Sequence, residues 1–85
     1  MNFRISDHAQ EECERRQVPL DVLREVLDNP GQIVAAEHNR VVYQSKVQFG
    51  AKLYLVRVIV DENEDPAAVI TVYRTSKIEK YWSES

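Results

Sequence analysis

An arginine in the middle of an otherwise apolar stretch is the first residue whose position suggests chemistry. Arg57 interrupts the segment Leu53–Val60, which has the composition of a strand buried on both faces. A charge at such a position is costly unless it is paired or faces a wet groove. Because side chains alternate between the two faces of a strand, Arg57 shares its face with Leu53, Leu55 and Ile59.

Hydroxyl-bearing side chains fall on one face of the last expected strand. The same period of two places Thr71, Tyr73 and Thr75 together on that face. We expect the all-apolar faces of both strands to pack against helices, so that Arg57 lies with these hydroxyls on the open face and Lys77 lies just beyond. The competing interpretation is that Arg57 pairs with an acid and that Tyr73 caps the core.

The first expected helix carries a second candidate set. His8, Glu12 and Arg16 are spaced i, i+4 and i+8, which places them on one side of a helix. His8 would then donate or accept a proton at a pH of about 7. The alternative is that His8 packs at the helix start while Arg16 pairs with Glu12, as exposed helical charges commonly do. Cys13 fits a small buried residue better than a nucleophile.

Several common types of site lack their signature in this sequence. There is no Cys/His spacing typical of a metal site, no glycine-rich phosphate loop, no nucleophile elbow and no distinct pair of carboxylates. We therefore expect no metal and no cofactor, and the cations and hydroxyls above remain the candidates.

The elements that must position these residues follow from changes in hydrophobic period. Ser6 or Asp7 can cap a helix over residues 6–17, and Pro19 suits the first turn of a second helix over residues 19–29. Alternation between short turns predicts three strands, over residues 41–49, 52–61 and 67–75. A further strand could begin over residues 32–37, and a short helix is expected over residues 76–82.

The fold class that these elements predict is α+β. Two N-terminal helices pack on one face of a three- to four-stranded antiparallel sheet, and a short helix closes the chain. The predicted core joins seven side chains of the sheet and the second helix: Val56, Val58, Ile70, Val72, Leu23, Val26 and Leu27.

The bulk composition favours one intracellular domain. A chain of 85 residues is too short to divide its core, so we expect a single domain over residues 1–85. A lone cysteine, no apolar signal core and no run of about 20 apolar residues predict a cytoplasmic protein without a membrane segment. The net charge of -3 and a pI of about 5.3 disfavour nucleic-acid binding, although residues 40–85 carry seven Lys or Arg against six acids.

Short motifs along nearly the whole chain resemble the RelE/ParE toxin superfamily, in particular a branch of small bacterial proteins with an N-terminal His-Ala motif. They are Ser-Asp-His-Ala at residues 6–9, Arg-Gln-Val-Pro at 16–19, Val-Leu-Asp-Asn-Pro at 26–30 with Ile33, and Val-Ile-Thr-Val-Tyr-Arg at 69–74. The resemblance implies helices on one face of an antiparallel sheet and an open groove on the other, in agreement with the elements above.

The resemblance also implies the toxin of a bacterial toxin–antitoxin pair. Such a toxin is most often a metal-independent endoribonuclease that cuts messenger RNA, commonly on the ribosome, and is silenced by an antitoxin. Side chains must then deprotonate the 2'-OH and fixed cations must meet the charge on the phosphorane. This assigns catalysis to Arg57, Tyr73, His8 and Lys77, and substrate binding to Arg74, Thr75, Thr71 and Arg16. The partners allowed are RNA or the ribosome, a cognate antitoxin and a second copy of the chain.

Two other classes of function stay open at this point. A non-enzymatic module could bind a protein through the same groove or an exposed strand edge, as the gyrase-poisoning members of the superfamily are thought to do, and an acidic pI fits that class better. A domesticated domain could keep the fold after loss of the chemistry. Growth arrest on overexpression and a small antitoxin-like gene beside this one would distinguish the toxin from both.

Overall fold

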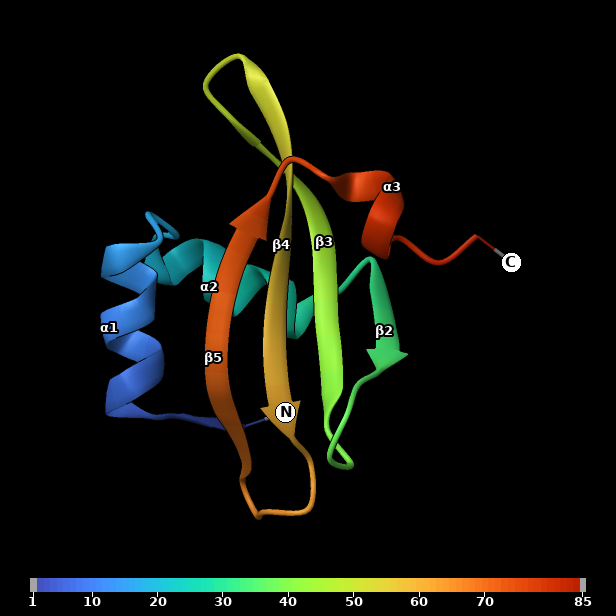
Figure 1. Ribbon diagram of the computed structural model, residues 1–85. Coiled ribbons are helices and arrows are strands. Elements are labelled where there is room, and N and C mark those ends of the chain that lie inside the picture. Colours follow the sequence, from blue (N-terminus) through green and yellow to red (C-terminus); the bar gives the residue numbers. More distant parts are fainter. Residues whose placement is uncertain (1, 85) are drawn as a thin grey trace.

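Three long strands form the middle of the sheet in the computed structural model, which describes residues 2–84 (Figure 1). β3 (Val41–Phe49), β4 (Lys52–Asp61) and β5 (Ala67–Thr75) are antiparallel neighbours in chain order. Gly50 has a φ of 59°, as a two-residue hairpin loop with glycine at its first position requires. The three predicted strand ranges are confirmed.

Two shorter strands extend the sheet at its edges. β1 (Phe3–Ile5) pairs in parallel with β5, and β2 (Gln32–Ala35) pairs antiparallel with β3, which gives the order β1-β5-β4-β3-β2. The turn between β2 and β3 places His38 and Asn39 at positive φ, 61° and 59°, a conformation that His and Asn adopt more readily than most residues. This turn makes β2 and β3 a hairpin.

The predicted fold class is wrong, because the sheet has five strands and is mixed rather than three- to four-stranded and antiparallel, and the helices are few and short. β1 has only three residues, too few for alternation to distinguish it from an irregular lead-in. Its parallel pairing with β5 also joins segments far apart in the sequence, Phe3 opposite Ala67, and no local pattern encodes such a pairing.

The two main helices are shorter than the predicted ranges that contain them. α1 (Asp7–Arg15) begins at Ser6, whose hydroxyl accepts from the Ala9 N–H at 3.1 Å, and α2 (Leu20–Asp28) follows Pro19. α3 (Ile78–Tyr81) is the short closing helix. α2 passes behind the sheet, α1 lies beside β5, and α3 sits near β2 and β3 (Figure 1). Within residues 2–84 no helix is long and apolar enough to cross a membrane.

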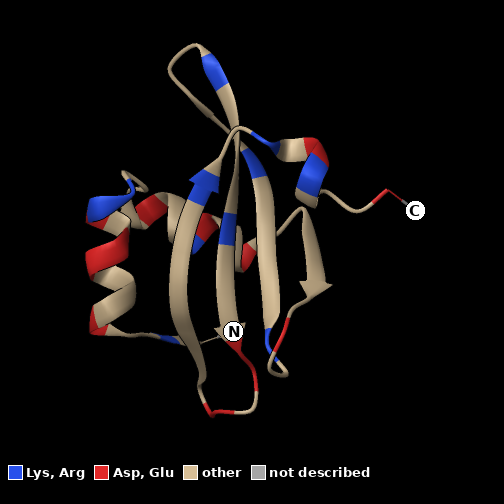
Figure 2. Ribbon diagram, viewed as in Figure 1, with Lys and Arg blue, Asp and Glu red and all other residues tan. Residues whose placement is uncertain are grey.

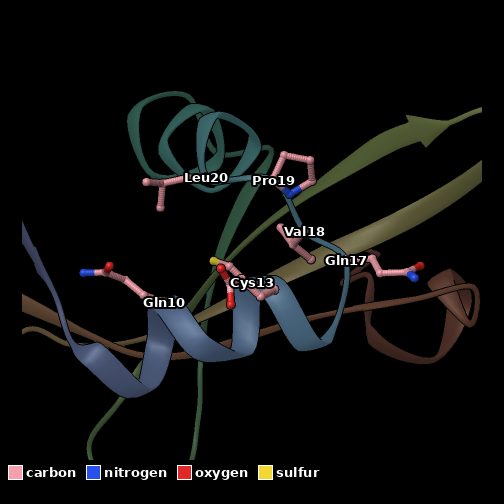
Figure 3. Close-up of a pocket in the computed structure, with 7 residues that line it drawn as sticks. Gln10, Cys13, Gln17, Val18, Pro19 and Leu20 are labelled. Atoms are coloured by element: carbon pink, nitrogen blue, oxygen red, sulfur yellow. The ribbon is translucent and has the colours of Figure 1, made fainter.

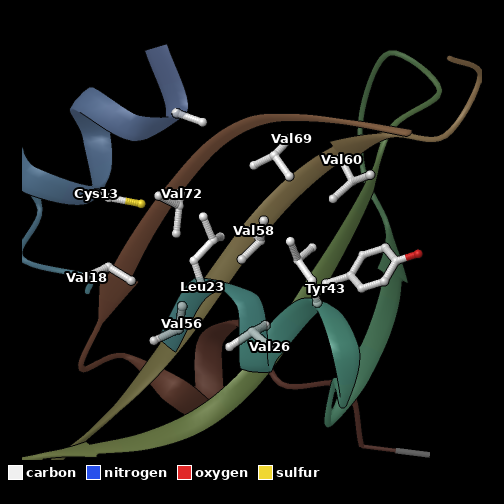
Figure 4. Close-up of a cluster of buried hydrophobic side chains, with 12 residues drawn as sticks. Cys13, Val18, Leu23, Val26, Tyr43, Val56, Val58, Val60, Val69 and Val72 are labelled. Atoms are coloured by element: carbon white, nitrogen blue, oxygen red, sulfur yellow. The ribbon is translucent and has the colours of Figure 1, made fainter. Parts of the chain in front are cut away.

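The hydrophobic core lies between the two main helices and one face of the sheet (Figure 4). Leu23 and Val26 of α2 meet Val56 and Val58 of β4, and all four are at most 1% exposed. The predicted place of Ile70 in this core is wrong. A register shift pairs Ile59 with Thr71 but Val60 with Val69, so that Val69 takes the buried position and Ile70 remains half-buried.

Candidate functional site

Arg57 lies on the sheet face opposite α1 and α2, directly between Gln44 of β3 and Tyr73 of β5. Its Nη1 donates to the Tyr73 hydroxyl at 2.6 Å, and its Nε donates to the Gln44 side-chain oxygen at 2.9 Å. The guanidinium carbon is 4.1 Å from the ring centroid of Tyr81 in α3, which is a favourable cation–π distance. These four side chains form what we call the Arg57 cluster: Arg57, Gln44, Tyr73 and Tyr81.

The charge of Arg57 has no acidic partner. Within residues 2–84 no Asp or Glu oxygen lies within 4.0 Å of its guanidinium, and both hydrogen-bond partners are neutral. An arginine has five N–H donors, of which two are used here, so three remain. No buried polar side-chain atom in the described part of the chain lacks a partner, so the unpaired Nη2 must reach solvent. The cluster therefore presents a cation that has aromatic and neutral polar partners but no carboxylate, and that keeps open donors.

Gln44 holds the cluster to the C-terminal segment. Its side chain is fully buried, and its Nε2 donates to Gln32 Oε1 at 2.9 Å and to the Tyr81 carbonyl at 3.1 Å. Gln32 in turn donates to the Ser83 carbonyl at 2.6 Å. Sequence reasoning missed both Gln44 and Tyr81. The available signal for Gln44 was the register of the hairpin at Gly50, which pairs Gln44 with Arg57.

Further cations surround the cluster. Lys80, by a hydrogen bond and by its charge, lowers the pKa of Tyr81 below its ordinary value, with smaller contributions from Tyr73 and Arg57 and with burial opposing the shift. Lys46 lies 4.3 Å from the Trp82 ring. Figure 2 shows Lys and Arg on β4, at the upper ends of β3 and β5 and on α3, which also carries an acidic residue, whereas most Asp and Glu lie on α1, on α2 and on the β4–β5 turn. Most of the acidic side chains that give the chain its negative net charge therefore lie away from the cluster.

Three other predicted site residues lie on or near the same face. Thr71 and Thr75 belong to β5 with the alternation of Tyr73, and both are half-buried. The Thr75 hydroxyl accepts from the backbone N–H of Lys77 at 3.1 Å, which fixes the chain where it leaves the sheet toward α3. Lys77 is exposed.

His8, Arg16 and Arg74 are placed away from Arg57. His8 is exposed on α1, whose buried residues pack on the opposite face of the sheet. Arg16, just after α1, has its Nε 3.7 Å from Glu12 Oε1, the pairing that the alternative interpretation predicted. Arg74 lies 4.5 Å from the Phe49 ring and donates to Gln17 at 2.9 Å. The cluster therefore forms without these three side chains.

A hollow of about 400 Å³ lies between α1 and the start of α2 (Figure 3). Cys13 lines it beside Val18, Pro19 and Leu20, and the thiol side chain is 6% exposed. Burial raises the pKa of the Cys13 thiol, which disfavours the thiolate that a nucleophile requires. Among residues 2–84 no group of three or more His, Cys, Asp or Glu side chains is placed to hold a metal ion.

Comparison with known proteins identifies a family but no close relative. None of the curated proteins and none of the solved structures matches the chain significantly. One family model matches residues 5–74, which include both main helices, all of β2 to β4 and most of β5. Arg57, Gln44 and Tyr73 lie inside this range, and Tyr81 lies outside it. The chain belongs to the family described as a domain of unknown function, DUF4258.

Proposed function

We propose that the Arg57 cluster binds the phosphate backbone of single-stranded RNA and cleaves it, so that the chain acts in the bacterial cytoplasm as the toxin-like ribonuclease, or translation inhibitor, of a toxin–antitoxin pair. The observation that carries the proposal is the guanidinium of Arg57, which has three open N–H donors and, among residues 2–84, no Asp or Glu oxygen within 4.0 Å. A phosphodiester oxygen is the kind of acceptor that such a group binds best.

The surroundings of Arg57 suit a single-stranded nucleic acid. Tyr73 and Tyr81 meet edge to face with ring centroids 6.4 Å apart, and Trp82 follows Tyr81 in the chain. Unpaired bases stack on such rings regardless of sequence, while lysines hold the backbone. Lys46, Lys77 and Lys80 supply that charge, which offsets the net charge of -3 locally.

Cleavage requires a general base and a general acid. A base removes the proton of the 2'-OH, the O2'–P bond forms, the P–O5' bond breaks and an acid protonates the departing 5'-oxygen. Tyr81, whose ring lies 4.1 Å from the Arg57 guanidinium and whose pKa is lowered, serves as the base, and Tyr73, which accepts from Arg57 at 2.6 Å, serves as the acid. Arg57 stabilises the charge that develops on the phosphorane.

A second candidate function is the binding of a protein partner without chemistry. The hollow between α1 and α2 favours it, because Leu20 at its rim is 40% exposed although it is a large apolar residue. The acidic net charge of the chain also suits this class better. In this case the Arg57 cluster would position α3 and would have no substrate.

The test compares four purified proteins in a translating cell extract: the wild type, Arg57→Ala, Tyr73→Phe and, as a matched control, Arg24→Ala, which removes an exposed arginine from α2. We expect the wild type and the control to stop translation and cut message. Loss of Arg57 should slow cleavage about 100- to 1,000-fold, because it removes a fixed cation that faces transition-state charge. Melting curves of the same proteins separate this loss from unfolding. Arrested translation with intact message would favour the protein-binding alternative, and a wild type that neither stops translation nor cuts message would exclude the toxin.

A further inference from the structure

The two edges of the sheet differ in how they are protected against pairing with another strand. β1 is three residues long and carries Arg4, which forms an ion pair with Glu64 at 2.8 Å. Short length and charge are the usual means by which an edge avoids further pairing. β2 has neither an acid nor a base between Gln32 and Ala36, and Ile33 within it is 53% exposed. β2 is also short, with four residues, but no charged side chain protects its edge, which is therefore the more open of the two.

The hydrogen-bond alternation of the hairpin fixes which β2 groups point outward. The Ala36 N–H donates to the Arg40 carbonyl at 2.9 Å, so these two residues form a hydrogen-bonded pair. Such pairs alternate along an antiparallel ladder. Val34 and Gln32 are then bonded to β3, whereas Ile33 and Ala35 direct their N–H and C=O groups away from the sheet. Within residues 2–84 the hydrogen bonds between the C-terminal tail and β2 involve the side chain of Gln32 and none of these outward backbone groups.

We propose that the β2 edge pairs with β2 of a second copy of this chain, in an antiparallel register centred on Val34. In this register Ile33 lies opposite the partner's Ala35 and Ala35 opposite the partner's Ile33. Both are hydrogen-bonded pairs, so every outward N–H and C=O of the two residues finds an acceptor or a donor.

The side chains of β2 favour a copy of the same strand over an unrelated one. Ile33 and Ala35 project from the same face of β2. In the two-fold register each exposed Ile33 side chain therefore packs beside the small Ala35 side chain of the other copy, which covers it. Neither strand brings a charge to the contact, so the copies do not repel each other there. The dimer would be one continuous sheet with both Arg57 clusters on the same side.

Disulfide cross-linking tests the register directly. Val34 faces its own copy across the axis in a non-hydrogen-bonded pair, where Cα atoms are about 4.5 Å apart, a separation that a disulfide spans. Val34→Cys should therefore form a covalent dimer under mild oxidation. Ile33→Cys is the matched control, because its thiol would face the partner's Ala35 and should not cross-link. The native Cys13 is buried and does not compete.

Light scattering on the protein without introduced cysteines measures the dimer dissociation constant and completes the test. Ile33→Pro removes an outward N–H and no backbone hydrogen bond to β3, so the monomer should still fold while the dimer dissociation constant rises about 10- to 100-fold for the two lost hydrogen bonds. Ile33→Thr keeps the N–H and should remain a dimer. A wild type that stays monomeric up to millimolar concentration overturns the proposal. So does a dimer that Val34→Cys fails to cross-link and that Ile33→Pro leaves intact.

Discussion

Replacing Gln44 with leucine removes the side chain that joins Arg57 to α3. The amide is fully buried, accepts from Arg57, and donates to Gln32 and to the Tyr81 carbonyl. A neutral hydrogen bond contributes about 0.5 to 1.5 kcal/mol and one to a charged group about 1.5 to 3 kcal/mol, so the three together contribute about 2.5 to 6 kcal/mol. Greater apolar burial by leucine offsets about 1 to 2 kcal/mol. We expect Gln44→Leu to lower the free energy of unfolding by about 3 kcal/mol, within limits of about 0.5 and 5 kcal/mol.

Urea denaturation followed by circular dichroism measures this loss, and the fluorescence of Trp82 reports separately on the segment after α3. Gln48→Leu is the matched control, because Gln48 lies on the same strand and the same face but is exposed and donates only to the Gly50 carbonyl, at 3.2 Å. The control should change stability by less than about 0.5 kcal/mol. If Gln44→Leu unfolds at the same urea concentration as the control, Gln44 does not hold the cluster together.

Three further changes test the core, the helix start and one buried tyrosine. Val58→Ala, at a fully buried site, should cost about 1 to 4 kcal/mol in urea denaturation, whereas Leu53→Ala, at a site 43% exposed, should cost much less; equal losses would contradict the burial. Ser6→Ala removes the side-chain cap of α1 and the hydrogen bond from the Ser6 hydroxyl to the Val69 carbonyl. It should lower the free energy of unfolding, measured by thermal melting, by about 1 to 2 kcal/mol. Burial, together with the Glu62 carboxylate, raises the pKa of Tyr43 to about 12 from 10.0. As the pH rises, the unfolded chain therefore loses the tyrosine proton before the folded chain does. The free energy of unfolding should fall by about 2 kcal/mol between pH 10 and pH 12. Tyr43→Phe should remove that part of the alkaline loss, and an unchanged pH profile would contradict the assignment.

The parts of the fold that could be predicted are those long enough to show a period. Each of β3, β4 and β5 has nine or ten residues, and α2 shows an apolar stripe through Leu23, Val26 and Leu27. β1 is too short for alternation, and no sequence pattern marks the register shift between Ile59 and Val60, which leaves Ile70 of β5 without an opposite residue. β2 was only suggested, because its turn uses His38 and Asn39 in place of the glycine that usually marks a tight hairpin.

Only the part of the candidate site that depends on alternation within a strand could be predicted from the sequence. Alternation within single strands placed Arg57 and Tyr73 on one face, where they hydrogen-bond. It does not say which residues of neighbouring strands are opposite each other, so Gln44 was missed. Tyr81 belongs to α3, which has four residues and whose docking depends on hydrogen bonds to Gln44 rather than on an apolar stripe. Helical spacing grouped His8 with Arg16 but carries no information on which side of the sheet the helix packs.

The chemical ends of cleaved RNA test the central claim most directly. Messenger RNA recovered from a translating extract treated with the wild-type protein, and with Arg57→Ala in parallel, is sequenced by methods selective for each type of end. Attack by the 2'-OH leaves a 2',3'-cyclic phosphate on one fragment and a 5'-hydroxyl on the other, because the ribose oxygen itself displaces the leaving group. The account predicts these ends with the wild type and their loss with Arg57→Ala. Intact message with the wild type, fragments with 5'-phosphates, or undiminished cleavage by Arg57→Ala would contradict it.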